Sequence, residues 1–581
     1  MQLKYRLSIT KPESHYVEVR IEGSRSSTDQ DLTFFLPAWS PGSYLMREYG
    51  KNIRQFQALS KSGVRLYHEL SGKSSYTVSW GKNEKHPGFE NRETEFTIIY
   101  QVYCHELTVR TSHIDSTHAF IHGPSVFMGV LDREILNPEL EVVLPNEWSK
   151  ISTGLKDISP SREVFRFTAA DYDELIDAPL EIGCHETDGF LVNNIPHELA
   201  FYGKTLPHQQ NLKKDIQTIV ETVLKTTKDI PYEKYTFMTH FVPQLFGGLE
   251  HLNSTALQYC SLKMAERKGY LQWLSLVAHE YFHTWNVKRI RPIELGPFDY
   301  LNEAMTRMHW LTEGLTSFMD DLFVLRSGLC TLDEYLDMQK GNLNRYFATP
   351  GRKFHSLEDS SYLAWVKLYR PDENSANSSV SYYLKGGLVF FILHKELVDH
   401  GSSIDEFIAK LWQRYLENPK QGLIADEVYE IILNLSSKAV LERFQTMVQT
   451  TEEIPLEKTW QELGVKFEFE AFSGRAFIGA KWKFDGERVL VEGVELDSPA
   501  FSAGLNAGDE LITMGDLRVL KSTLPEFETG LKPVSAVPLR VSRLGRLIEL
   551  TVQTTKYPQT TLKALKCDEP ETAKKYLFLK A

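Results

Sequence analysis

Residues 279–283 have the types and the spacing that bind a metal ion: His279-Glu280-Tyr281-Phe282-His283, or H-E-x-x-H. Apolar residues recur at helical intervals in and before this stretch, which predicts a helix. Histidines four positions apart lie on one side of a helix, about one turn apart, where both can bind one zinc ion. Glu280 lies beside them and can take a proton from a metal-bound water, whose pKa zinc lowers toward about 7. The alternative is a core helix that carries two polar-facing histidines.

A third metal ligand is needed, because a catalytic zinc normally has three protein ligands and one open position. Glu313 is the candidate, since it lies off the apolar helical face formed by Leu311, Leu315 and Phe318. Twenty-nine residues separate it from His283, which leaves room for a loop and a returning helix. The alternative is a solvated glutamate on the surface.

The elements that must position these residues begin with an expected N-terminal β domain. Residues 1–185 alternate between apolar and polar types, as at Leu3, Tyr5 and Leu7, and turn residues punctuate the pattern. The character changes near residue 190, where helical periodicity begins. We expect a catalytic domain over residues 186–455 that is mixed α/β to about residue 325 and helical beyond it.

A third block begins after Pro455, which cannot continue a helix. Short strands are predicted there over residues 465–469, 489–494, 511–514, 539–541 and 548–552. Residues 456–560 suffice for one small β-rich domain, and residues 561–581 form a C-terminal tail. The whole chain is therefore expected to be a multidomain α+β protein.

Composition excludes several classes of partner. The 581 residues are 42% hydrophobic and 24% charged, as in folded globular proteins, and the net charge of −12 does not favour binding to nucleic acid or to an anionic membrane. No apolar run reaches the ~18 residues that a transmembrane helix needs. The first ten residues alternate like a strand and lack the apolar core of a signal peptide. The five cysteines include no C-x-x-C pair, so we expect a cytoplasmic protein with reduced thiols. No feature of the sequence specifies an oligomeric state.

Longer motifs in this chain resemble those of one class of zinc enzymes. H-E-x-x-H-x-W followed by W-L-x-E-G resembles the gluzincin aminopeptidases. Three further stretches narrow the resemblance to one family: Pro37–Tyr44 (PAWSPGSY), Gly247–His251 (GGLEH) and Thr284–Pro292 (TWNVKRIRP). Together they resemble the glycyl aminopeptidase family of zinc metallopeptidases. That family joins an N-terminal β domain, a thermolysin-like catalytic domain and a C-terminal PDZ domain, in the order seen along this chain.

The resemblance implies a role for each residue of the metal motif. It implies that His279, His283 and Glu313 bind one zinc ion and that Glu280 is the general base. Residues that follow the motif, such as Asn286 and Arg289, can support the site or simply pack, and the sequence does not distinguish these uses.

Residues 247–251 are similar to the G-x-M-E-N segment of related aminopeptidases, with Leu249 and His251 as departures. The resemblance implies an edge strand whose Glu250 binds the free amine of the substrate, and an ammonium group does need such a carboxylate. Gly247 and Gly248 would let the substrate backbone approach closely. The alternative is an ordinary turn with a surface glutamate.

An oxyanion donor is implied by Tyr383-Leu384-Lys385-Gly386, which resembles a Y-x-K-G segment of the same enzymes. Its tyrosine hydroxyl would stabilise the tetrahedral intermediate, and one such donor is typically worth ~3 kcal/mol. Tyr382 is adjacent, so the assignment to Tyr383 depends on the alignment of Lys385 and Gly386. The alternative is a tyrosine that belongs to the core.

The C-terminal block has glycines and apolar residues spaced as in a PDZ domain. Ser498-Pro499-Ala500, Ala503-Gly504-Leu505 and Gly508–Ile512 carry this similarity. PDZ domains bind a peptide as an added strand and hold its terminal carboxylate on backbone amides. The corresponding loop near Phe477–Gly479 departs from the usual G-L-G-F pattern. The domain can therefore bind a peptide or protein ligand, or serve only for packing.

The expected function is that of a zinc aminopeptidase, with peptides as substrates. Zinc and Glu280 would activate water, Tyr383 would stabilise the oxyanion, and Glu250 would bind the free N-terminus. The family resemblance implies glycine or alanine as the first residue. One alternative is a zinc endopeptidase or a broader aminopeptidase. Another is a non-catalytic PDZ-containing peptide-binding protein with structural zinc, although such a site needs no base at Glu280.

Overall fold

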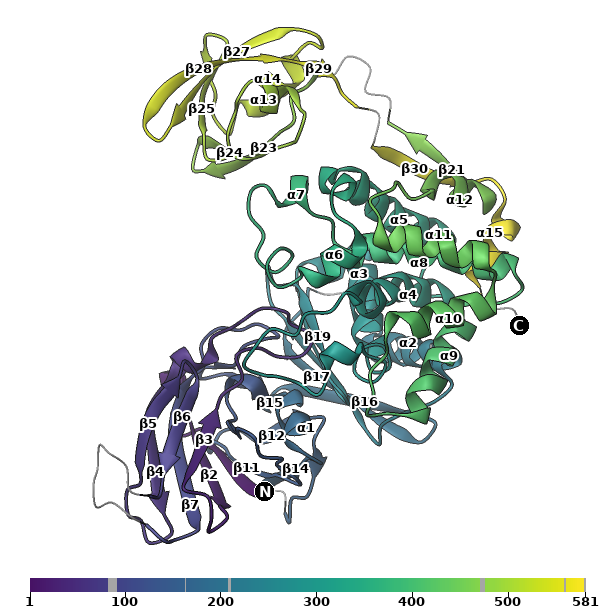
Figure 1. Ribbon diagram of the computed structural model, residues 1–581. Coiled ribbons are helices and arrows are strands. Elements are labelled where there is room, and N and C mark those ends of the chain that lie inside the picture. Colours follow the sequence, from purple (N-terminus) through teal and green to yellow (C-terminus); the bar gives the residue numbers. More distant parts are fainter. Residues whose placement is uncertain (82–90, 162–163, 207–209, 471–475, 559–560, 579–581) are drawn as a thin grey trace. The chain divides into compact units, whose positions relative to one another are not determined.

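The computed structural model describes residues 1–81, 91–161, 164–206, 210–470, 476–558 and 561–578 (Figure 1). The chain divides into two compact units. Unit 1 contains Met1–Ala304 and Ile408–Ile424, and unit 2 contains Met305–Phe407 and Ala425–Ala581.

The first part of unit 1 is rich in strands, as the alternating sequence predicts. In spatial order, the largest sheet contains β13 (Lys156–Asp157), β14 (Phe165–Thr168), β11 (Glu139–Val143), β1 (Leu3–Ser8), β2 (Tyr16–Ser24), β7 (Glu95–Tyr103) and β4 (Ile53–Ser60). Leu3, Tyr5 and Leu7 of β1 point into the core, while Lys4 and Arg6 between them are exposed.

Two four-stranded sheets complete this part of unit 1. One contains β10 (Gly129–Val130), β3 (Asp31–Phe35), β6 (Ser75–Ser79) and β5 (Tyr67–Gly72), and the other contains β12 (Lys150–Thr153), β15 (Leu180–Gly183), β9 (His118–Ile121) and β8 (His113–Ile114). A short helix, α1 (Tyr172–Asp177), precedes β15, and Asp171 caps its first turn through Glu174 N.

The second part of unit 1 is a mixed five-stranded sheet with two helices. The spatial order is β16 (Glu186–Val192), β17 (Ile195–Gly203), β18 (Tyr235–Phe241), β20 (Ser254–Tyr259) and β19 (Gly247–Glu250), and the helices are α2 (Leu212–Thr227) and α3 (Arg267–Phe282). β17, β18 and β20 are parallel, while β16 and β19 run antiparallel at the two edges.

The central strand β18 is buried along its whole length, because both of its faces are covered. On one face, Tyr235 and Phe237 pack against Tyr281 of α3, with ring centroids 5.1 and 5.6 Å apart. On the other face, Met238 packs against Phe120 of β9. The five-stranded sheet is therefore enclosed between the helices and the strands of the N-terminal part.

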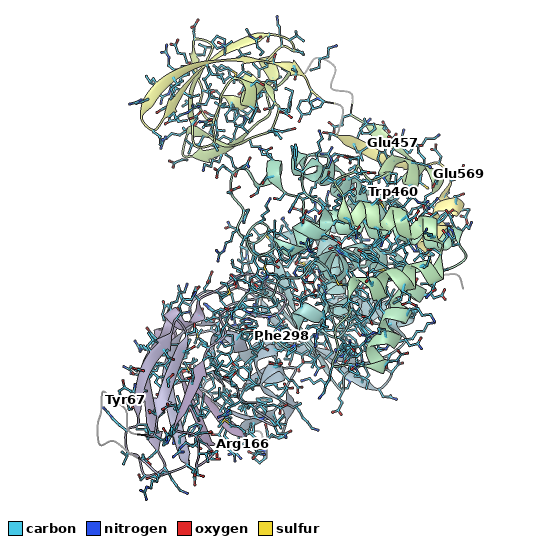
Figure 2. The ribbon with its side chains drawn as sticks, viewed as in Figure 1. Tyr67, Arg166, Phe298, Glu457, Trp460 and Glu569 are labelled. Carbon is cyan, nitrogen blue, oxygen red and sulfur yellow. The ribbon has the colours of Figure 1, made fainter. Side chains whose placement is uncertain are left out.

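Unit 2 is built around one buried helix, α8 (Tyr382–Asp399). Among the described helices, six pack on it: α4 (Leu315–Arg326), α5 (Leu332–Phe347), α6 (Leu357–Tyr362), α11 (Lys438–Gln449), α12 (Leu456–Glu462) and α15 (Pro570–Leu577). Its apolar run from Leu388 to Leu393 is buried, and Trp460, labelled in Figure 2, stacks on Phe391 at 4.3 Å. None of the described helices is both long and apolar enough to cross a membrane.

The last part of unit 2 returns to strands where the sequence predicts them. A sheet contains β23 (Ala480–Asp485), β24 (Arg488–Val494), β25 (Glu510–Met514), β27 (Ala536–Arg543) and β28 (Arg546–Gln553), with β26 (Leu517–Arg518) beside β25. Val489, Leu511 and Val541 belong to a separate small core of this sheet. The predicted strand at 465–469 is β21 (Val465–Phe469), which pairs with β30 (Leu562–Cys567).

Candidate active site

The predicted metal-binding helix is α3, and it places both histidines on one side. His279 lies in its last turn and His283 is the C-cap residue. Their ring centroids are 4.7 Å apart, with the ring planes nearly perpendicular. His283 is buried, while His279 is half-buried. The two imidazoles are therefore positioned to bind one ion from the same side of the helix.

The tautomer of His283 suits metal binding. Its Nδ1 lies 2.6 Å from the backbone oxygen of Asn286, so Nδ1 carries the proton and donates it to that carbonyl. The other ring nitrogen, Nε2, then has the lone pair that a metal ion requires. Asn286 thus supports His283 through its backbone, a role that its side-chain type could not reveal.

The segment 247–251 forms the edge strand that the resemblance implies. β19 lies at the end of the sheet order and pairs only with β20 among the described strands. A Cβ atom placed on Gly248 would overlap the Glu280 carboxylate, so this carboxylate lies directly against the backbone of the strand. One ligand-capable atom from each of Glu250, Glu280 and His283 lies within 4.8 Å of the others.

Glu250 is buried, with only 3% of its surface exposed, so the surface-glutamate alternative is wrong. Its Oε1 has no hydrogen-bond partner among the described residues. Gly42, from the segment Pro37–Tyr44, covers the carboxylate: a Cβ atom there would lie 2.6 Å from Oε1. A buried and incompletely paired carboxylate is costly, and a cationic group of a ligand would relieve that cost.

A cavity of about 240 Å³ adjoins Glu250 within unit 1. Its lining includes Trp39, His251, Lys288 and Phe298, the last of which is labelled in Figure 2. The cavity thus combines aromatic walls with charged groups, as small-molecule and peptide sites often do.

One ion pair in the wall of this cavity was not apparent from the sequence. Lys288 Nζ lies 2.6 Å from Asp177 Oδ1, and Leu252 N donates to Asp177 Oδ2 at 2.6 Å. Burial would raise the pKa of Asp177, but Lys288 and His251 hold it below its usual range. Asp177 and Lys288 are 111 positions apart, so no local pattern could have joined them.

Unit 2 carries the other two predicted site residues. Glu313 lies in a π-helical turn, Trp310–Gly314, directly before α4, and only 1% of its surface is exposed. This burial excludes the solvated-surface alternative. π-helical turns occur frequently at functional sites, where they change the direction of a side chain.

Tyr383 lies in the first turn of α8, beside the helix that carries Glu313. Its hydroxyl lies 3.4 Å from that of Tyr369. Burial and the nearby Glu313 carboxylate raise the pKa of Tyr383 well above its usual value, so the hydroxyl keeps its proton and can donate. Tyr382 is fully buried and stacks on His309, with ring centroids 5.1 Å apart.

The structure groups the predicted residues within each unit. Unit 1 holds Gly247, Gly248, Glu250, His279, Glu280 and His283, and unit 2 holds Glu313 and Tyr383. The donor set fits zinc, because it contains two imidazoles, one with its tautomer fixed, and a buried carboxylate.

Comparison with known proteins agrees with these features. Residues 4–184 match the peptidase M61 N-terminal domain, and residues 272–389 match the M61 glycyl aminopeptidase domain. No curated protein matches the chain.

Solved structures show the same fold. An aminopeptidase N family protein from Idiomarina loihiensis is 28% identical, with a TM-score of 0.91 over 99% of this chain and all of its own length. An M1 zinc metallopeptidase from Deinococcus radiodurans, solved as a mutant bound to a Tyr-Ser-Ala substrate, has a TM-score of 0.51 and 12% identity, covering 78% of this chain and 95% of that one. The latter likeness concerns the fold alone.

The sequence matches define a peptidase of the aminopeptidase class. The chain carries the N-terminal and catalytic domains of the M61 glycyl aminopeptidase family.

Proposed function

We propose that this protein is a zinc-dependent aminopeptidase that removes an N-terminal glycine or alanine from peptides. The observation that carries this proposal is the buried Glu250 carboxylate, which lies beside Glu280 and His283 and has an oxygen with no hydrogen-bond partner in the described part of the chain. A free α-ammonium group is the part of a peptide that such a carboxylate binds best.

His279, His283 and Glu313 are the proposed ligands of a single zinc ion. Bound zinc would polarise the scissile carbonyl and lower the pKa of a bound water. Support comes from the imidazole pair on α3, the Nδ1 hydrogen bond of His283, and the burial of Glu313. The matched M61 family and the order of motifs along the chain agree with this assignment.

The proton steps fall to Glu280. It would accept the proton of the attacking water and pass it to the amine that leaves when the peptide bond breaks. Its carboxylate lies against the backbone of β19, so it faces the strand along which the substrate would extend. Gly247 and Gly248 would leave room for the substrate main chain.

Two groups would orient the substrate at its reacting end. Glu250 would bind the free ammonium group, and only the first peptide bond would then reach Glu280. Tyr383 would donate its hydroxyl proton in a hydrogen bond to the oxyanion, because its raised pKa keeps it protonated.

The C-terminal residues 456–560 are proposed to form a PDZ domain with a peptide or protein ligand. Ser498 caps the short helix α13 (Pro499–Ser502) through Phe501 N. Gly504 and Gly508 have positive φ angles of 78° and 87°, which turns of this kind require. β23 and β28 lie at the edges of the sheet, where a ligand can add as a further strand.

The proposal is tested by hydrolysis of glycyl, alanyl and leucyl peptides before and after removal of zinc with a chelator. Glycyl and alanyl peptides should be cleaved fastest, and restored zinc should restore the rate. The Glu280→Gln variant should lose roughly 10²–10⁴-fold in kcat while keeping its zinc. Equal cleavage of leucyl peptides would indicate a broader aminopeptidase. No cleavage of any peptide by the zinc-loaded protein would favour a binding protein.

A further inference from the structure

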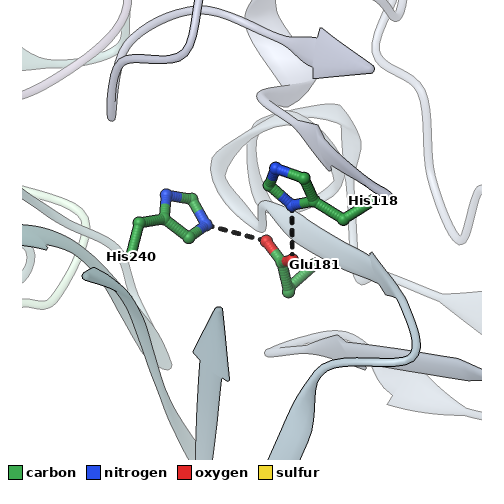
Figure 3. A group of neighbouring side chains, drawn as sticks. All are labelled: His118, Glu181 and His240. Carbon is green, nitrogen blue, oxygen red and sulfur yellow. Dashed lines mark hydrogen bonds and ion pairs between the residues drawn. The ribbon is translucent and has the colours of Figure 1, made fainter. Parts of the chain in front are cut away.

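A second group of metal-ligating side chains lies in unit 1, apart from the proposed catalytic residues. Figure 3 shows His118 and His240 on either side of the Glu181 carboxylate. His118 Nδ1 lies 2.8 Å from Glu181 Oε1, and His240 Nε2 lies 2.8 Å from Glu181 Oε2. Each of the three residues is 1% exposed. One ligand-capable atom from each lies within 4.8 Å of the other two.

Two of the sheets of unit 1 place these residues face to face. His118 lies on β9 and Glu181 on the neighbouring strand β15. Glu181 lies opposite Phe120, which is two residues from His118, so His118 and Glu181 are diagonal neighbours on one face. His240 lies on β18, on the face of the five-stranded sheet that also carries Met238. The cluster thus joins three strands from two sheets.

In the described part of the chain, the Glu181 carboxylate forms no ion pair with a lysine or arginine. Its hydrogen-bond partners among the described residues are the two imidazoles, and its ion pairs are with the same two rings. A buried carboxylate is costly unless it is fully paired, and a divalent cation held between the two imidazoles would pair it.

The donor types match a divalent transition-metal ion. Two imidazole nitrogens and one carboxylate oxygen are ligands of Zn²⁺, and ligand atoms about 2.0–2.2 Å from an ion lie roughly 3–3.5 Å from one another. The observed hydrogen-bonded separations of 2.8 Å need only a small outward shift. Gln258 lies behind His240, with its side-chain nitrogen 3.4 Å from Nδ1. With the amide turned over, its oxygen would accept a hydrogen bond from a protonated Nδ1, as partners of metal-bound histidines do.

We propose that His118, Glu181 and His240 form a second metal site, which takes a divalent transition-metal ion such as zinc and joins the four-stranded sheet to the five-stranded sheet. This site is separate from the residues proposed for catalysis. Its ion would have a structural role, because His118, Glu181 and His240 do not line the cavity beside Glu250, where the substrate is proposed to bind.

Three further histidines lie in a row between the surface and this site. The His113 ring lies 5.3 Å from that of His118, the His105 ring lies 6.2 Å from that of His113, and the His15 ring lies 4.5 Å from that of His105. His105 is exposed and His113 is nearly buried. A buried metal site needs such an entry path, and transient imidazole ligands would supply one.

The test is the zinc content of the full-length protein after chelator treatment, reloading with zinc alone and removal of free metal. Wild type should hold two zinc ions per chain. A His279→Ala/His283→Ala variant should hold one, and adding Glu181→Gln should remove it. His197→Gln is the matched control, because it removes another buried histidine of unit 1 that is neither a proposed ligand nor part of the histidine path, and it should leave the wild-type content unchanged.

The outcomes separate this proposal from the proposed function. If the catalytic zinc is absent but this site exists, wild type holds one ion that Glu181→Gln removes and His279→Ala/His283→Ala does not. A folded Glu181→Gln protein with the same zinc content as wild type would overturn the proposal. If that variant does not fold, anomalous scattering at the zinc edge from wild-type crystals decides, since a peak is expected between His118 and His240 and its absence overturns the site.

Discussion

Gly314 and Gly386 meet backbone to backbone where the turn that carries Glu313 crosses the helix that carries Tyr383. A Cβ atom on Gly314 would lie 2.8 Å from the Cα atom of Gly386, and the reverse distance is the same. Neither position can accept a side chain without separating the two segments. The glycines of the W-L-x-E-G and Y-x-K-G motifs thus allow the proposed zinc ligand and the proposed oxyanion donor to lie on touching segments.

We predict that Gly386→Ala lowers kcat at least tenfold and destabilises the protein by about 1–3 kcal/mol, because the added methyl forces the segments apart. Gly387→Ala is the matched control. A Cβ atom there meets its nearest neighbours at 3.5 Å, an ordinary contact, and alanine favours the helix by up to about 1 kcal/mol. Urea unfolding and peptide hydrolysis measure both effects. Equal activity in the two variants would show that this crossing does not position the site.

Gly248→Ala should inactivate the enzyme, because the new methyl group would overlap the Glu280 carboxylate. We expect kcat to fall at least a hundredfold, as happens when a catalytic group is displaced by about 1 Å. Gly247→Ala gives the comparison, since a Cβ atom there meets nothing closer than 3.8 Å. It should keep kcat within a few-fold and raise KM, if substrate lies along this strand. A Gly248→Ala protein with wild-type kcat would contradict the contact.

Tyr383→Phe should lower kcat roughly a hundredfold with little change in KM, because the hydroxyl is proposed to act only on the oxyanion. Tyr382→Phe should change kcat much less, since that ring is fully buried and stacked on His309. Steady-state kinetics on a glycyl peptide compares the two. The reverse order of effects would move the donor role to Tyr382.

Lys385 should make stability depend on alkaline pH. The residue is fully buried, and burial lowers its pKa to about 8, with Glu453 acting in the opposite direction. Because the unfolded chain keeps a pKa near 10.4, it binds more protons than the folded chain between pH 8 and about 10.4. The free energy of unfolding should therefore rise with pH across this window. Below pH 8 the charged, buried Lys385 destabilises the folded protein by about 3 kcal/mol, and this cost disappears as the pH rises to about 10.4.

Urea midpoints of wild type and Lys385→Met at several pH values measure this effect. The variant should lack the rise and should differ most from wild type near pH 7. Lys438→Met, at a position with 83% of its side chain exposed, is the control and should follow wild type. Parallel curves for wild type and Lys385→Met would show that Lys385 carries no such cost.

Local patterns were sufficient for the features that lie within one element. The apolar residues at helical intervals around H-E-x-x-H predict α3, the alternation at Leu3, Tyr5 and Leu7 predicts β1, and both were confirmed. Five further strands of the C-terminal block lie where their apolar runs predict them. The edge position of β19 followed from the family resemblance and could not be derived from four residues alone.

Features that depend on distant segments could not be predicted in this way. Glu181 meets His118 and His240 across 63 and 59 positions, from strands of two sheets. Gly42 covers Glu250 from the N-terminal part of the chain. In each case the packing of whole sheets brings the residues together, and no periodicity or spacing within a single segment records it.

The central claim is that Glu250 binds the free amine of a peptide substrate. The most direct measurement is kcat/KM for one glycyl peptide with a free and with an acetylated N-terminus, in wild type and in Glu250→Gln. Wild type should cleave the free peptide at least a hundredfold faster than the acetylated one, since acetylation removes the charge that Glu250 binds. Glu250→Gln should lose most of this difference by slowing on the free peptide. Equal cleavage of both peptides by wild type would contradict the aminopeptidase assignment and would leave a zinc endopeptidase in its place.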